Sequence, residues 1–342
     1  MTVDKVVLAA PRGFCAGVEM AIKALTWMVR AFPAPVYCYH EIVHNKIVVE
    51  RFQSLGVVFI DNIEDVPEGS PVMLSAHGSA PEVVVKAREA GRFVVDAVCP
   101  LVTKVHHEVK VRSKKGHQII YIGHQGHEEA VGTMAVAPSS THRVESIEEI
   151  ADLPAFEKPV SLLAQTTLSH RDWSSILNAA KERFPTLSVP GRSDLCFATT
   201  NRQGSLMAIA EQCDSVIVIG SSNSSNTRAL ERLAQEVGCG DVYRVNHADE
   251  IPQTLKGVVG VTAGASAPEE LVQEVISKLA PSEGVEELHF VTEEEYFPPP
   301  RELRPLINAI GFFANLGFSK SELKPVNEDR SIGASEVLTT LI

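Results

Sequence analysis

Three cysteines stand in similar surroundings, each just before a pattern typical of a helix. They are Cys15 in "VVLAAPRGFCAGVEMAI", Cys99 in "VVDAVCPLVTKVHHEV" and Cys196 in "RSDLCFATTNRQGSLMAIA". Along the chain they lie roughly one small α/β unit apart, which suggests a threefold repeat in which each unit offers one thiolate to a shared centre. Thiolates from separate loops bind zinc or an iron–sulfur cluster. The C-x-x-C pairs of structural zinc sites are missing, although a three-ligand zinc with an open position fits the sequence.

An iron–sulfur cluster normally has four cysteine ligands, so three cysteines would leave one iron free for an outside ligand. A free iron acts as a Lewis acid toward a substrate oxygen and also carries electrons, two tasks that zinc cannot combine. The cysteines therefore indicate either redox chemistry at an open iron or Lewis-acid chemistry at zinc.

Histidines follow several predicted strands, where ligands gather in open parallel sheets. His44 lies in "EIVHN", His77 in "SAHGSA", and His124 and His127 in "GHQGHEE". A neutral imidazole donates one hydrogen bond and a protonated one donates two, so converging histidines suit a phosphate. Short polar residues also open predicted helices, whose free backbone N–H groups bind anions. These residues are Ser224, Ser225, Asn226 and Ser266.

Two further motifs suggest proton transfer. Glu128 and Glu129 follow His127, and Thr166 and Thr167 in "AQTTLSH" end a predicted strand. A carboxyl group near a metal-bound oxygen is a candidate proton donor, and a threonine hydroxyl can relay the proton. The chain has neither G-x-x-x-x-G-K-[ST] nor G-x-G-x-x-G, so ATP and dinucleotides are not indicated.

Composition restricts the partners and the compartment. The chain has 342 residues and a formal net charge of -12, which argues against a general nucleic-acid or anionic-membrane surface. No run approaches the ~20 apolar residues of a membrane span, and no signal peptide is evident, so we expect a cytoplasmic protein with reduced thiols. Cys38, Cys213 and Cys239 lack the strand, turn and helix setting, and we interpret them as buried hydrophobes.

Short β-branched runs alternate with amphipathic segments, which predicts an α/β protein with mostly parallel sheets. The expected strands are residues 5–10, 35–40, 71–76, 92–98, 117–123, 159–165, 214–220, 240–245 and 256–264. The expected helices include residues 17–32, 81–91, 226–238 and 268–280.

Together these motifs closely resemble the 4-hydroxy-3-methylbut-2-enyl diphosphate reductase family, which acts last in the methylerythritol phosphate route to isoprenoids. The motifs are "RGFCAGV", "EIVHN", "DAVCPLVTKVH", "GHQGHEE", "AQTTLS", "DLCFATTNRQ", "SSNSSNTRAL" and "TAGASAP". The resemblance implies a trefoil of three similar α/β units around a central 4Fe-4S cluster. We expect these units at residues 1–99 (with Cys15 and Cys99 at its ends), 100–192 and 193–290, followed by a C-terminal segment at 291–342 that ends in a poorly ordered tail, residues 327–342.

The resemblance also implies a role for each site residue. The cluster ligands would be Cys15, Cys99 and Cys196, and the catalytic proton donor would be Glu129 together with Thr166. The substrate contacts would be His44, His77, His127, Thr166, Thr167, Ser224, Ser225, Asn226 and Ser266. This chain has Glu128 where the family usually has proline.

The implied reaction is a two-electron reductive dehydroxylation of the allylic diphosphate to isopentenyl diphosphate and dimethylallyl diphosphate. The implied electron donor is ferredoxin or flavodoxin. Such donors are usually acidic, so docking on this acidic chain would need a local basic patch. Two alternatives remain, a zinc-dependent hydrolase of a phosphorylated metabolite and a non-catalytic iron–sulfur sensor.

Overall fold

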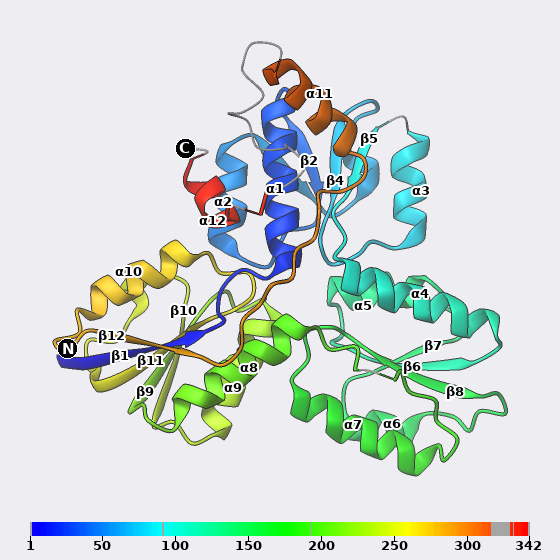
Figure 1. Cartoon of the computed structure of the whole chain (residues 1–342). Helices are drawn as coiled ribbons and strands as arrows, with labels where there is room; N and C mark the ends of the chain where they lie inside the picture. The colour runs from blue at the N-terminus through cyan, green and yellow to red at the C-terminus, as the bar shows by residue number, and fades with distance from the viewer. Residues whose placement is uncertain (1, 91, 192, 316–328, 331, 341–342) are drawn as a thin grey trace.

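Three parallel β-sheets with helices packed on them form three lobes around a common centre (Figure 1). The structure is a computed structural model and describes residues 2–90, 92–191, 193–315, 329–330 and 332–340. Within these residues every strand pairing is parallel. The predicted α/β class and the threefold arrangement are therefore confirmed.

The three sheets differ in size and in the parts of the chain that they use. The five-stranded sheet has the order β10-β9-β11-β1-β12 and contains β1 (Thr2–Ala10), β9 (Ser215–Ile219), β10 (Asp241–Val245), β11 (Lys256–Ala263) and β12 (Val285–His289). The four-stranded sheet has the order β3-β2-β4-β5 and contains β2 (Val36–Tyr39), β3 (Val57–Ile60), β4 (Pro71–Leu74) and β5 (Phe93–Asp96). The three-stranded sheet has the order β7-β6-β8 and contains β6 (Gln118–Ile122), β7 (Thr141–Val144) and β8 (Val160–Ala164).

The helices connect and cover these strands. In the described residues they are α1 (Ala16–Ala31), α2 (Lys46–Ser54), α3 (Pro81–Glu89), α4 (Pro100–Lys114), α5 (Glu128–Ala135), α6 (Ile147–Asp152), α7 (His170–Arg183), α8 (Phe197–Ala210), α9 (Ser225–Glu236), α10 (Glu269–Leu279), α11 (Arg304–Asn315) and α12 (Ala334–Thr339). None of the helices in this part of the chain is long and apolar enough to cross a membrane.

Several strands were predictable because most of their residues are buried. Every residue of β8 and β9 is buried, and a parallel strand covered on both faces is a continuous apolar run in the sequence. The sequence analysis missed β3, β7 and β12, which are all edge strands. An edge strand pairs on one side only, and most residues of β12 are exposed, so its sequence carries no apolar run.

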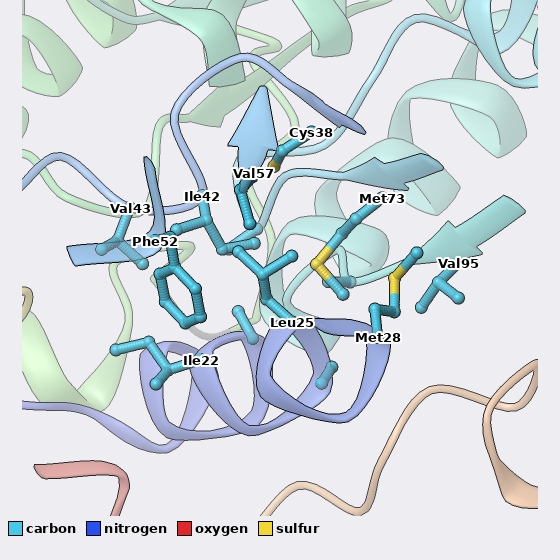
Figure 2. Packing of buried hydrophobic residues seen from close by; sticks show 14 of the residues in the cluster. Ile22, Leu25, Met28, Cys38, Ile42, Val43, Phe52, Val57, Met73 and Val95 are labelled. Atoms are coloured by element: carbon cyan, nitrogen blue, oxygen red, sulfur yellow. The ribbon is translucent and has the colours of Figure 1, made fainter. Parts of the chain in front are cut away.

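The core of the four-stranded lobe lies between α1 and its sheet (Figure 2). Leu25 and Met28 of α1 belong to the same buried cluster as Met73 of β4 and Val95 of β5. Fully burying one such side chain contributes about 1.5–3 kcal/mol. Cys38 is fully buried in this cluster, which confirms its interpretation as a small hydrophobe.

The first strand of the chain lies in the same sheet as some of the last strands. β1 pairs with β11 on one side and with β12 on the other. The N-terminal strand of the expected unit 1–99 therefore belongs to the five-stranded sheet, with strands of the expected unit 193–290, and not with β2 to β5. The other unit boundaries stay predictions.

The C-terminal end packs on the four-stranded lobe. Ala334 and Leu338 of α12 are buried in the cluster around α1. The Ala334 backbone N–H donates to Glu19 Oε2 (2.7 Å), and Lys23 Nζ donates to the Asp329 carbonyl (3.1 Å). The expectation of a poorly ordered tail over 327–342 is thus wrong for α12, because two of its three apolar residues, Ala334 and Leu338, are buried against α1.

Candidate active site

Each sheet anchors one of the three cysteines. Cys15, Cys99 and Cys196 are the N-cap residues of α1, α4 and α8. The backbone N–H of each donates to a carbonyl in a loop that leaves a strand: Cys15 to Ala265 after β11 (3.2 Å), Cys99 to Ala76 after β4 (3.1 Å) and Cys196 to Thr166 after β8 (2.9 Å). Cys196 does not itself follow a strand, contrary to its sequence pattern, and this hydrogen bond ties it to β8. The cysteines thus lie at the carboxyl ends of parallel strands, where such sheets place ligands.

The three thiols face one space. A Cβ atom added to Gly17 would lie 2.9 Å from Cys99 Sγ and 3.9 Å from Cys15 Sγ, so only glycine fits between them. Burial raises the pKa of the Cys196 thiol to about 11, and the nearby Cys15 adds to this shift. Burial, with Cys15 and Cys196, also raises the pKa of Cys99. Such thiols lose their protons when a cation lies beside them, as metal ligands do.

One cavity at the meeting point of the lobes collects all the residues to which the family resemblance gives a role. These are Cys15, Cys99, Cys196, Glu129, Thr166, Thr167, His44, His77, His127, Ser224, Ser225, Asn226 and Ser266. Apolar side chains, among them Val18, Val43, Leu101 and Phe297, complete its walls. The roles of these residues stay predictions, but the fold brings them together from all three lobes.

Three imidazoles line the cavity. The His44 and His77 rings stack with centroids 3.9 Å apart, and the His127 ring stands nearly perpendicular to both, at 5.1 Å and 6.0 Å. His127 Nδ1 accepts a hydrogen bond from the Glu129 backbone N–H (3.2 Å), so a neutral His127 carries its proton on Nε2. Burial lowers the pKa of His77, and it lowers that of His127 to about 2. These two imidazoles are therefore neutral at pH 7 unless an anion binds beside them.

Two carboxylates contact the histidines from outside the cavity lining. Glu128 Oε2 lies 2.7 Å from His77 Nδ1, and Glu41 Oε2 lies 3.5 Å from His44 Nδ1. His44, His77 and Glu128 lie close enough together to resemble a metal site. The stacked rings are only 16° from parallel, however, so their nitrogen lone pairs do not converge on one ion. Glu128 instead lies in close contact with His77 without hydrogen-bond geometry, since His77 Nδ1 and Glu128 Oε2 both lack a hydrogen-bond partner among the described residues.

Buried polar atoms without partners indicate that the cavity receives a polar ligand. Both amide atoms of Asn226, which is 3% exposed, lack a hydrogen-bond partner among the described residues, and so does His44 Nε2. A buried polar atom left unpaired costs about 1–3 kcal/mol, a cost that a bound anion or hydroxyl group would remove.

The hydroxyl groups next to Asn226 have partners that hold the helix start in place. Ser224 caps α9, because its Oγ accepts from the Thr227 backbone N–H (3.3 Å). Ser225 Oγ donates to the Thr167 carbonyl (3.4 Å). Ser266 Oγ donates to the His44 carbonyl (2.9 Å) and so links two lobes. The start of α9 therefore presents backbone N–H groups and Asn226 to the cavity.

A buried carboxyl group completes the cavity. Glu129 is 2% exposed, its Oε1 accepts from the Thr166 backbone N–H (2.8 Å), and its Oε2 lies 2.9 Å from Thr166 Oγ1. Burial raises the pKa of Glu129 to about 7, against the lowering effect of the hydrogen bonds from Thr166. A carboxyl group with this pKa exchanges its proton near neutral pH, and both Glu129 and Thr166 line the cavity.

His124 is not part of this arrangement. Its Nδ1 lies 2.9 Å from Glu145 Oε1, and it does not line the cavity. The prediction that it joins the other histidines is wrong, because the turn between it and His127 directs the two side chains to different surroundings.

The sequence analysis missed the residues that hold the cysteine loops. Arg202 of α8 is fully buried, donates to the carbonyls of Gly13 (2.7 Å) and Phe14 (3.1 Å), and pairs with Glu293 (3.0 Å). It thereby joins the helix that begins at Cys196 to the loop that precedes Cys15. The sequence around Arg202, "DLCFATTNRQ", gives no local signal of this role, because an arginine on a helix is usually exposed.

The segment after β12 runs across the centre of the molecule to α11 on the four-stranded lobe (Figure 1). It carries Glu293, the partner of Arg202, and Phe297, which lines the cavity. This segment therefore closes one side of the site, although its sequence has no strand or helix pattern that would predict such a role.

Replacing Arg202 with alanine is expected to lower the free energy of unfolding by about 3–5 kcal/mol, because it leaves the Glu293 carboxylate and two carbonyls without their partner. Denaturant unfolding of the protein measures the loss. The control is Arg171→Ala, which removes an exposed ion pair with Glu236 and is expected to cost about 0–1 kcal/mol. Equal losses in the two variants would contradict the anchoring role of Arg202.

Three parallel-sheet lobes that bring three thiols, three imidazoles and one buried carboxyl group to a shared cavity define an α/β protein with a cysteine-lined site. Residues 6–280 match the LytB protein family, and the chain belongs to that family.

The proteins of similar sequence and the similar solved structure are all named as diphosphate reductases. The chain is 44% identical to the 4-hydroxy-3-methylbut-2-enyl diphosphate reductase of Corynebacterium efficiens, over 89% of this chain and 93% of that protein. It is 45% identical to the protein of that name in Methylocella silvestris, over 87% and 96%. Its structure resembles that of the E-1-hydroxy-2-methyl-but-2-enyl-4-diphosphate reductase of Plasmodium falciparum, with a TM-score of 0.86, 32% identity, and coverage of 91% of this chain and all of that chain.

Proposed function

We propose that this protein is an oxidoreductase that converts 4-hydroxy-3-methylbut-2-enyl diphosphate to isopentenyl diphosphate and dimethylallyl diphosphate, the last step of the methylerythritol phosphate route. Each turnover takes up two electrons and two protons and releases one water. The observation that carries this proposal is the single cavity that unites three half-buried cysteines, an anion cradle and a buried carboxyl group in a LytB family member.

The group that fits the thiols is a 4Fe-4S cluster held by Cys15, Cys99 and Cys196. Three sulfurs that converge from three lobes leave one iron without a cysteine ligand. When bound, such a cluster supplies the electrons and a Lewis-acidic iron. The glycine between Cys15 and Cys99 and the buried state of the thiols support this assignment.

The diphosphate is bound by neutral donors in place of lysines or arginines. We assign it to the three imidazoles His44, His77 and His127 and to the start of α9, with Ser224, Ser225 and Asn226, and further contacts from Ser266 and Thr167. The unpaired amide of Asn226 and the unpaired His44 Nε2 support this assignment, since each has an open hydrogen-bonding position. The cradle holds the anion although the chain as a whole is acidic, because these donors are local.

Glu129 and Thr166 supply the proton that lets the substrate hydroxyl leave as water. The carboxyl group keeps a proton near neutral pH because it is buried, and the 2.9 Å contact with Thr166 Oγ1 provides the route to the cavity. The electron donor in this proposal is a ferredoxin or a flavodoxin, and the cytoplasm is the predicted compartment.

Anaerobic Mössbauer spectroscopy of protein enriched in the resonant iron isotope tests this proposal, together with product analysis in the presence of a chemical reductant. We expect one iron site that differs from the others and changes when the diphosphate substrate is added, and both isoprenoid diphosphates as products.

Two other outcomes would replace the proposal. Zinc without acid-labile sulfide, together with hydrolysis of a phosphorylated metabolite, would identify a zinc hydrolase. A cluster whose iron sites are equivalent and indifferent to substrate, with no turnover, would identify an iron–sulfur sensor.

A further inference from the structure

α4 carries positive charge in an otherwise acidic protein. It contains Lys104, Lys110, Arg112 and Lys114, with Lys115 at its C-cap, and Glu108 is its one acidic residue. The whole chain has a formal net charge of -12. α10, by contrast, has an acidic first turn of Glu269 and Glu270. The basic residues of α4 therefore form a local positive region on a negative molecule.

The lysines of α4 project from one side of the helix into solvent. Lys104, Lys110 and Lys114 are exposed, and their spacing places them on one face, while Val102, Val105 and Val109 are buried on another. Lys110, Lys114 and Lys115 have no ion-pair partner among the described residues, so their charges are available to a partner. We call Lys104, Lys110, Lys114 and Lys115 the lysine stripe.

The lysine stripe begins beside one of the three cysteines. Cys99 caps α4, and Pro100, Thr103 and Lys104 of the first turn are exposed. Thr103 Oγ1 donates to the Cys99 carbonyl (3.3 Å), so an exposed side chain contacts the Cys99 backbone directly. At ~1.5 Å per residue, the stripe extends from about 8 Å to about 23 Å from Cys99 along the helix axis.

The other two cysteines lack such a surface. The residues on either side of Cys15 and of Cys196 are buried or half-buried, whereas Pro100 next to Cys99 is exposed. Among the three cysteines, Cys99 is therefore the one that is bonded directly to an exposed residue.

We propose that the lysine stripe of α4 is the docking surface for a small acidic electron-transfer protein, whose electrons enter the cysteine-lined site by way of Cys99. This proposal rests on the proposed function, which requires an external reductant. The donor loses one electron in each encounter, so two encounters and two protons balance the release of one water. Encounters of this kind bury little area and depend on charge complementarity, which suits four lysines on an exposed helix.

The test compares two double variants with equal changes of charge. Lys110→Glu with Lys114→Glu reverses the stripe. Lys181→Glu with Lys256→Glu is the matched control, since Lys181 and Lys256 are also exposed and α7, which carries Lys181, lies on the opposite side of the three-stranded sheet from α4 (Figure 1). The probe is a flavodoxin of negative net charge, and two quantities are measured with the iron-loaded protein, the dissociation constant for oxidised flavodoxin and the flavodoxin-driven turnover.

At an ionic strength of about 0.01 M, where charges act over ~30 Å, we expect the stripe variant to bind flavodoxin at least about tenfold more weakly than the control, with a similar loss of kcat/KM for flavodoxin. At about 1 M the difference should vanish, because screening then acts within ~3 Å. Turnover with dithionite and methyl viologen should stay that of the parent protein, since neither lysine lines the cavity. The neutral variant Lys110→Gln with Lys114→Gln should have a dissociation constant for flavodoxin between those of the parent protein and the charge-reversed variant.

Equal flavodoxin binding by the stripe variant and the control would overturn the proposal. So would a stripe variant that loses affinity for duplex DNA while its flavodoxin binding is unchanged, because the stripe would then be a nucleic-acid surface. If the parent protein does not convert the diphosphate substrate with dithionite and methyl viologen, the proposed function is overturned, and the docking surface with it.

Discussion

The Glu129→Gln protein is expected to turn over about 10²–10⁴-fold more slowly than the parent, with its iron and sulfide content unchanged. Glutamine has the size of glutamate. Its Oε1 can still accept from the Thr166 backbone N–H and its Nε2 can donate to Thr166 Oγ1, so the backbone at the end of β8 should keep its place. It cannot release a proton, and a substrate oxygen that must leave as water then lacks its donor.

The pH dependence of the parent protein follows from the same carboxyl group. Burial raises the pKa of Glu129 to about 7, so the protonated donor predominates below that pH and is lost above it. We expect turnover to fall about tenfold per pH unit above neutrality in the parent, and this descending limb to be absent from the residual activity of Glu129→Gln.

The same shift predicts a change in stability. The folded protein holds the proton of Glu129 more tightly than the unfolded chain does, so this group destabilises the fold as the pH rises from about 4.5 to about 7. Glutamine removes that penalty. The Glu129→Gln protein should therefore unfold at a higher denaturant concentration than the parent at pH 8 and not at pH 5.

The matched control is Glu128→Gln. Glu128 contacts His77 and does not line the cavity. Because it would act only through His77, we expect the variant to bind substrate more weakly and to keep a kcat within about tenfold of the parent value. Full activity of Glu129→Gln, or an equal loss of kcat in both variants, would show that the proton donor is assigned wrongly.

The Cys196→Ser protein is expected to lose most of its iron and acid-labile sulfide, and with them its turnover. Changes in groups that merely support a metal ligand lower metal affinity by about 10–100-fold, so removing a ligand should cost more. Cys196 Sγ also accepts from the Thr199 backbone N–H (3.2 Å), a contact that serine can keep, so the start of α8 should stay folded. Iron, sulfide and visible absorption after anaerobic reconstitution measure the loss.

Cys213 and Cys239 provide controls of the same chemistry. Cys213 Sγ contacts the Ile209 carbonyl (3.1 Å) and Cys239 Sγ contacts the Ala210 carbonyl (3.3 Å), and a serine hydroxyl can make either contact. Neither residue lines the cavity, so both serine variants should retain parent amounts of iron. A normal iron and sulfide content in Cys196→Ser would contradict the proposed ligand set.

Much of the fold could be predicted because many strands are apolar runs, which can be recognised from the local sequence alone. Apolar runs such as "SVIVI" in β9 are buried on both faces, and their composition alone predicts a parallel strand. Strand β12 and the tail helix α12 lacked such signals. β12 is mostly exposed, and α12 is short, with two buried residues whose packing partner, α1, lies at the other end of the chain.

The residues of the site also fall into two groups, those with a local signal in the sequence and those without one. Cys15, Cys99, the histidines and the serines at helix starts could be picked out because each stands at a local boundary between elements. Arg202 and Phe297 could not, because their importance depends on contacts with Gly13, Phe14 and the cavity, which are remote in sequence. His124 and His127 show the limit of a motif, since neighbouring histidines in one turn lie in different surroundings.

The amino-acid sequence by itself determined which groups are present and which elements carry them: three thiols that begin helices, imidazoles and hydroxyls near strand ends, and an α/β alternation. Only the tertiary structure decided that these groups meet in one cavity, that β1 joins the five-stranded sheet, and that α4 presents a lysine stripe beside Cys99. It also decided the chemistry of Glu129, whose pKa rises because the packed chain buries it. The physical reason is that residue type and local pattern depend on neighbours in sequence, whereas convergence, burial and desolvation depend on segments that only the packed chain brings together.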